Sequence, residues 1–96
     1  MKGGWVYIMT NRPFGTLYVG VTNDIARRAW EHRQGEGAAF TSRYTLNRLV
    51  FAERHESIVT AIERETSLKR WPRKWKLDLI ETQNPGWEDL FPRINA

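Results

Sequence analysis

The segment LYVGVTNDIARRAWEH, residues 17–32, places an arginine and a histidine on one face of a predicted helix. Arg28 and His32 are four positions apart, so they are neighbours on a helix surface. Ile25 and Ala29 lie close beside them, which puts both polar groups at the edge of the apolar stripe. The planar fork of a guanidinium suits a phosphate, and the two side chains are expected to project together.

A carboxylate interrupts the apolar face of a second predicted helix that begins after Ser57. Positions three and four apart form that face: Ile58, Ala61, Ile62, Glu65 and Leu68. An unpaired carboxylate there is costly, so Glu65 should have a cation, a metal ion or several hydrogen bonds as its partner. Lys69 follows four residues later and could pair with it or contact a substrate phosphate.

Two tyrosines occupy adjacent strands of a predicted β-hairpin. Tyr7 belongs to WVYIM at 5–9 and Tyr18 to LYVGV at 17–21, and the loop between them contains Asn, Pro and Gly. At Gly20 the missing side chain allows another backbone or a phosphate to approach. The hairpin therefore predicts one wall of a site.

Changes in apolar period predict the order strand, strand, helix, strand, helix, helix. The helix after the hairpin starts near Asp24 and stops near Gly35, 35–45 is a loop, and the tail from Asn84 is irregular. Beyond the hairpin, the predicted elements are a strand at 48–54, a helix from Ser57 to Trp71, and a helix at 72–82, with Trp87, Leu90 and Phe91 packing the tail. This predicts a single α+β domain, 1–96, with a small three-stranded, at least partly antiparallel sheet flanked by helices.

Composition narrows the class of protein. The chain has 96 residues, no cysteine and a net charge of +4, with a pI near 9.9. Without cysteine there is no disulfide and no thiolate metal site, so a cytoplasmic location is expected. No segment is apolar for long enough to span a membrane. The positive charge favours an anionic partner, nucleic acid first.

These residues together resemble the GIY-YIG nuclease superfamily, in particular its small single-domain (UPF0213-like) members. WVY at 5–7 is similar to the GIY element, and YVG at 18–20 to the YIG element. The stretch TNDIARRAWEH is similar to the family's helix, with Arg28 and His32 at the positions of the catalytic arginine and the common histidine. AIERETSLKRW resembles the segment with the metal-binding glutamate, in a register that selects Glu65. Trp5 replaces the first glycine of GIY, and we expect no attached recognition domain.

The resemblance implies hydrolysis of a nucleic-acid phosphodiester with one divalent metal ion, Mg²⁺ or else Mn²⁺. Glu65 would hold the metal and Arg28 would stabilise the transition state from a second side. Tyr7 or Tyr18 would take the proton from water, although a phenol with a reference pKa of about 10 is a poor base unless a nearby cation lowers its pKa. His32 would either hold a tyrosine or handle protons itself. We expect these five residues to converge on one surface.

A basic segment, RETSLKRWPRKWK at 64–76, adds candidate phosphate contacts. Trp71 and Trp75 within it could stack on an unpaired base or flank a groove. Packing is the favoured interpretation, because a chain this small needs large apolar groups to fold. The candidate substrate-binding residues are Gly20, Lys69, Arg70, Arg73 and Lys74.

The sequence therefore predicts a metal-dependent endonuclease acting on DNA, with structured or damaged DNA in repair or recombination among its candidate substrates and RNA not excluded. The alternative is a degenerate domain that binds nucleic acid through the same basic surface without cleaving it. The sequence favours no particular protein partner.

Overall fold

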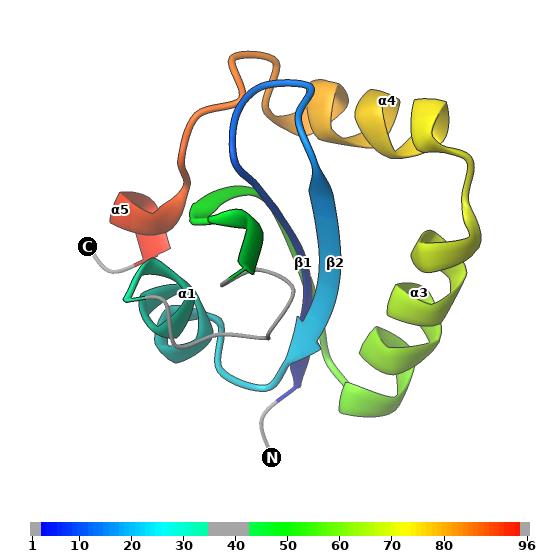
Figure 1. Ribbon diagram of the computed structural model, residues 1–96. Coiled ribbons are helices and arrows are strands. Elements are labelled where there is room, and N and C mark those ends of the chain that lie inside the picture. Colours follow the sequence, from blue (N-terminus) through cyan, green and yellow to red (C-terminus); the bar gives the residue numbers. More distant parts are fainter. Residues whose placement is uncertain (1–2, 35–42, 95–96) are drawn as a thin grey trace.

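A computed structural model describes residues 3–34 and 43–94 of the chain. Its centre is a three-stranded sheet with the order β2-β1-β3 (Figure 1). The strands are β1 at Gly4–Thr10, β2 at Leu17–Thr22 and β3 at Arg48–His55. Both neighbours pair antiparallel with β1, so the predicted hairpin is confirmed and the whole sheet is antiparallel.

Helices cover both faces of this sheet. Figure 1 shows α1 and α5 on one side of the strands and α3 and α4 on the other. Their bounds are α1 Ile25–Arg33, α3 Ile58–Arg70, α4 Arg73–Gln83 and α5 Phe91–Ile94. The α+β class predicted from the sequence is confirmed. In the described parts of the chain, no helix combines the length and the apolar character that crossing a bilayer requires.

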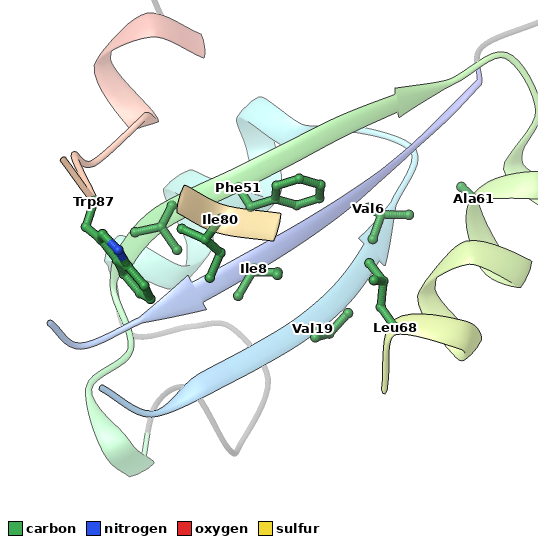
Figure 2. Close-up of a cluster of buried hydrophobic side chains, with 9 residues drawn as sticks. Val6, Ile8, Val19, Phe51, Ala61, Leu68, Ile80 and Trp87 are labelled. Carbon is green, nitrogen blue, oxygen red and sulfur yellow. The ribbon is translucent and has the colours of Figure 1, made fainter. Parts of the chain in front are cut away.

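The central strand supplies both cores because its side chains alternate between the two faces. Val6 and Ile8 point toward α3 and α4, and Figure 2 shows them beside Val19 of β2 and Leu68 of α3. All nine buried members of this first core are Val6, Ile8, Val19, Val50, Phe51, Ala61, Leu68, Ile80 and Trp87. A second core on the α1 face contains Tyr7, Met9, Ile25, Ala29, Leu46 and Leu49.

Local signals set the helix starts as expected. Asp24 caps α1 by accepting from the backbone N–H of Arg27 at 3.2 Å, and Ser57 caps α3 by accepting from that of Val59 at 3.0 Å. Pro72 stands at the N-cap of α4. The apolar spacing in α1 is confirmed, since Ile25, Ala29 and His32 are its buried residues.

Four local predictions need correction. Ile62 is 47% exposed, because the buried face of α3 runs only through Ala61, Glu65 and Leu68. Trp75 is 54% exposed and is no core residue, whereas Trp71 does pack partly against the first core. The tail is not wholly irregular, because α5 forms within it. Of the predicted loop at 35–45, residues 35–42 lie outside the described residues and 43–44 are helical.

Asn84 connects the end of α4 to β3 and to the tail. Its amide nitrogen donates to the carbonyl of Val50 at 3.1 Å and to that of Glu88 at 2.9 Å. Its amide oxygen accepts from the backbone N–H of Glu88 at 3.1 Å. The side chain is buried, so these three bonds replace contacts with water.

Asn84→Ala should therefore destabilise the fold, because it leaves buried backbone groups without partners. We expect a loss of about 2–3 kcal/mol in the free energy of unfolding, measured by urea denaturation. The control is Thr82→Ala, whose exposed hydroxyl donates to the carbonyl of Asp78 on the same helix. That variant should lose less than about 0.5 kcal/mol. Equal losses would contradict a structural role for Asn84.

Candidate active site

Tyr7 lies opposite Gly20 in the antiparallel pairing of β1 with β2. A Cβ atom added at Gly20 would stand 2.4 Å from both Cζ and the hydroxyl oxygen of Tyr7. The phenol of Tyr7 therefore lies against the backbone of β2 in space that only a glycine leaves open. The group that approaches Gly20 in the structure is thus the ring of Tyr7, and not the backbone or phosphate that the sequence suggested.

The hydroxyl of Tyr7 is held by two residues of α1. It lies 3.1 Å from Nε2 of His32, and the guanidinium of Arg28 donates a hydrogen bond to it. Tyr7 is only 1% exposed. Burial raises the pKa of Tyr7 to about 12, and the cation of Arg28 opposes this only in part. Tyr7 is therefore a neutral phenol at physiological pH.

His32 is buried behind this phenol. Burial, together with the nearby charge of Arg28, lowers the pKa of His32 below its ordinary value. The ring is therefore neutral near pH 7. Arg28 can only donate, so the oxygen of Tyr7 accepts from Arg28, and the phenol hydrogen is available to Nε2 of His32.

Arg28 reaches this cluster from the edge of α1 and is also restrained by a carboxylate. Its Nε lies 3.2 Å from Oε1 of Glu31, whose other oxygen lies 3.3 Å from Nε of Arg27. The side chain of Arg28 is 38% exposed. It opens onto a polar pocket of about 450 Å³ at the start of α1. The sequence analysis missed Glu31, although a carboxylate three and four residues after two arginines is the helical pairing signal.

Tyr18 completes the aromatic part of the cluster from β2. Its ring centroid lies 6.3 Å from that of Tyr7 and 5.9 Å from that of His32. The ring of Tyr7 lies 5.7 Å from that of His32. Tyr18 is half-buried and lines an outer groove, whereas Tyr7 is enclosed. Two strands and one helix thus bring together four of the five predicted residues.

Glu65 approaches from the other face of the sheet. It lies on the buried side of α3, and its carboxylate is 2.6 Å from Nζ of Lys69. The pair stands near the edge strand β2, since Lys69 lines the same groove as Tyr18. The negative charge of Glu65 contributes to the raised pKa of Tyr7. The four residues on the α1 face therefore form one cluster, with Tyr7 and His32 buried in it, whereas Glu65 lies on α3 across the sheet. The convergence of all five on one surface stays a prediction.

The chemistry of this carboxylate is compatible with a divalent cation. Glu65 is 9% exposed and already has a cation beside it, the ammonium of Lys69. Among the described residues, no three acidic, histidine or cysteine side chains gather as a complete metal cage. A single carboxylate with water and substrate phosphates as the other ligands is a common Mg²⁺ arrangement. The residues therefore fit a metal that substrate helps to hold.

The other basic candidates, Arg70, Arg73 and Lys74, lie away from this cluster, and their contact with substrate stays a prediction. Arg73 donates to the carbonyls of Phe14 and Gly15, both at 2.8 Å, and so ties α4 to the hairpin loop. Lys74 pairs with Asp78 at 3.1 Å in solvent. Arg70 is exposed at the end of α3. None of these three lines the groove beside Tyr18, whereas Lys76, which was not among the predicted site residues, does.

Sequence comparisons agree with this arrangement. A profile of the GIY-YIG catalytic domain matches residues 3–78. The UPF0213 protein of Staphylococcus aureus strain Mu3 is 35% identical over 81 residues, which cover 84% of this chain and 98% of that protein. The UPF0213 proteins of strains N315 and MW2 match with the same identity and coverage. No solved structure matches the chain.

The raised pKa of Tyr7 predicts a loss of stability in alkali that Tyr7→Phe should lack. The unfolded chain releases this proton near pH 10, whereas the folded protein keeps it until about pH 12. The contribution of Tyr7 to the free energy of unfolding is therefore complete below pH 10. It falls by about 3 kcal/mol as the pH rises through 12.

Urea denaturation at intervals from pH 9 to about 12 measures this difference between parent and variant. Tyr44→Phe is the control, because Tyr44 is 48% exposed, and its curve should run parallel to that of the parent. An equally steep decline in Tyr7→Phe would contradict the assignment of a buried, neutral phenol.

Gly20→Ala should disturb the phenol directly. The new methyl would overlap the ring of Tyr7, so the ring must move away from His32. We expect a loss of about 1–3 kcal/mol in thermal unfolding. Gly86→Ala is the matched control, since a Cβ there meets nothing closer than 3.4 Å. Similar midpoints for the two variants would show that Tyr7 does not need the space at Gly20.

Proposed function

Because the chain belongs to the GIY-YIG catalytic-domain family, we propose that it is a divalent-metal-dependent endonuclease that hydrolyses phosphodiester bonds in DNA. The observation that carries the proposal is the attachment of Arg28 to the Tyr7–His32 pair at the mouth of a polar pocket. A surface arginine is ordinarily mobile, and here a phenol and a carboxylate hold it. A restrained guanidinium beside an open pocket suits a phosphate.

Each residue of the cluster has a proposed role in the hydrolysis. Arg28 binds the scissile phosphate and neutralises the charge that develops on its oxygens. Tyr7 and His32 are positioning residues, because both are buried and hold Arg28 from behind. Tyr18 is the phenol that an attacking water can reach, since it lines the outer groove. In its deprotonated form, Tyr18 would orient that water and accept its proton.

Glu65 is the ligand proposed for Mg²⁺, with Mn²⁺ as a substitute. When bound, the metal supplies Lewis-acid stabilisation of the phosphoryl and leaving oxygens. Lys69 has to leave Glu65 for this to happen, and its side chain is 54% exposed, so water can receive it. The carboxylate of Glu65 then remains at its buried position without the ammonium of Lys69 beside it.

Structured or damaged DNA, as met in repair or recombination, is the proposed substrate class, and the proposed location is the cytoplasm. The net charge of +4 supports a polyanionic ligand. The second candidate function is a nucleic-acid-binding module without turnover. The direct ion pair between Glu65 and Lys69 favours it, because that pair opposes metal binding.

The deciding experiment compares Glu65→Gln with Glu63→Gln. Glu63 lies on the same helix but is exposed, so its replacement removes an equal charge away from the site. Labelled single-stranded, duplex, flap and junction DNA, and one RNA strand, are incubated with each protein in chelator, Mg²⁺ or Mn²⁺. We expect metal-dependent DNA products from the parent and from Glu63→Gln, and none from Glu65→Gln.

Thermal unfolding provides a readout that does not depend on turnover. Mg²⁺ should raise the unfolding midpoint of the parent and of Glu63→Gln, because a ligand that binds the folded state stabilises it. It should leave Glu65→Gln unchanged. In chelator, Glu65→Gln should lose at most about 1 kcal/mol, since Lys69 can turn to solvent. The binding module would be favoured if the protein bound DNA but gave no cleavage products, and if Mg²⁺ did not shift its unfolding midpoint.

A further inference from the structure

A groove outside the Tyr7–His32–Arg28 cluster runs between the edge strand β2 and the helices α3 and α4. Its volume is about 280 Å³, near the lower end for sites that hold a small molecule. The residues that line it are Leu17, Tyr18, Val19, Lys69 and Lys76. Three consecutive residues at the sheet edge, from β2, and one lysine from each helix line it.

We propose that this groove binds one nucleotide of the DNA strand next to the scissile phosphate, an inference that rests on the proposed endonuclease function. Leu17 and Val19 offer an apolar surface to a sugar or base, and Tyr18 offers a phenol ring. Lys69 and Lys76 supply positive charge for the adjoining phosphate. A nucleotide combines these two requirements, an apolar face and a phosphate, in one unit.

The position of Lys76 is defined by the helix before it. Its ammonium is 3.5 Å from the backbone carbonyl of Lys69, at the end of α3. Its side chain is half-buried, in contrast to that of Lys74, which is 81% exposed. Lys76 is therefore held over the groove, whereas Lys74 and its partner Asp78 stand in solvent.

The groove is also continuous with the proposed site. Tyr18 belongs to both, because its ring contacts the His32 ring and lines the groove. Lys69 connects the groove to Glu65 through their ion pair. A strand that passes over the edge of β2 would meet Arg28 on one side of Tyr18 and the two lysines on the other. This geometry assigns the groove to a neighbouring nucleotide of the same strand.

The test measures binding in chelator, so that it is independent of cleavage. Fluorescence anisotropy of a labelled single-stranded DNA of mixed sequence is recorded over a series of salt concentrations. Lys76→Met removes the charge and keeps most of the side-chain volume, and Lys76→Arg restores a charge. Lys74→Met is the matched control on the same helix. Thermal unfolding of each variant confirms that it is folded.

We expect Lys76→Met to bind on the order of fivefold more weakly and to reduce the slope of log K against log salt by about 0.7, the value for one phosphate on a single strand. Lys74→Met should match the parent, and Lys76→Arg should recover most of the affinity. Equal losses of affinity in Lys76→Met and Lys74→Met, or no loss in Lys76→Met, would overturn the proposal that the groove binds a nucleotide. So would a parent protein that does not bind the strand.

The two proposals fail separately. If Lys76→Met weakens binding but no DNA is cut with any metal, the proposed nucleotide site stands and the endonuclease proposal does not. If DNA is cut in a metal-dependent way while Lys76→Met binds like the parent, the proposed nucleotide site is wrong and the endonuclease proposal stands.

Discussion

The absence of a side chain at Gly20 is the constraint on which the site depends. The pairing of β1 with β2 places Tyr7 directly opposite this position, and the phenol occupies the space that a Cβ would fill. Only from there does the hydroxyl reach His32 and Arg28 on α1. A shift of the hairpin by one residue would send every side chain of β2 to the opposite face. The register of one strand pair therefore fixes the geometry of three side chains.

Charge near the site is balanced locally rather than by the net charge of the protein. Glu31 restrains Arg28 on its solvent side, and Lys69 accompanies Glu65 beyond β2. Each of these pairs lies within one turn of a single helix, so its formation costs little chain entropy and needs no distant element. Tyr7 and His32 are buried as a neutral phenol and a neutral imidazole, and their neutrality avoids the desolvation of an unpaired ion. The exposed partners are the ones that a charged ligand can displace.

The sequence predicted what depends on local period and missed what depends on distant contacts. The hairpin, the helix starts and the burial of Ile25 and Ala29 follow from alternation, capping and helical spacing, and all were correct. His32, predicted at the edge of that apolar stripe, is buried with them. Arg73 donates to carbonyls 58 and 59 positions earlier, and no local pattern signals such a contact. Ile62 and Trp75 were placed inside because their apolar character was counted without knowing how narrow the covered face of each helix is. The catalytic and substrate-binding roles themselves remain predictions.

The tail has a consequence for where this domain begins and ends. The family match stops at residue 78, yet Trp87 belongs to the first core, and the backbone N–H of Leu90 donates to the carbonyl of Leu49 at 2.7 Å. Asp89 in turn accepts from the backbone N–H of Leu49 at 3.2 Å, so the tail covers the outer edge of β3. A fragment trimmed to the matched region would leave that edge open to pairing with other chains. The stretch that the family profile matches is thus shorter than the unit that closes the outer edge of β3.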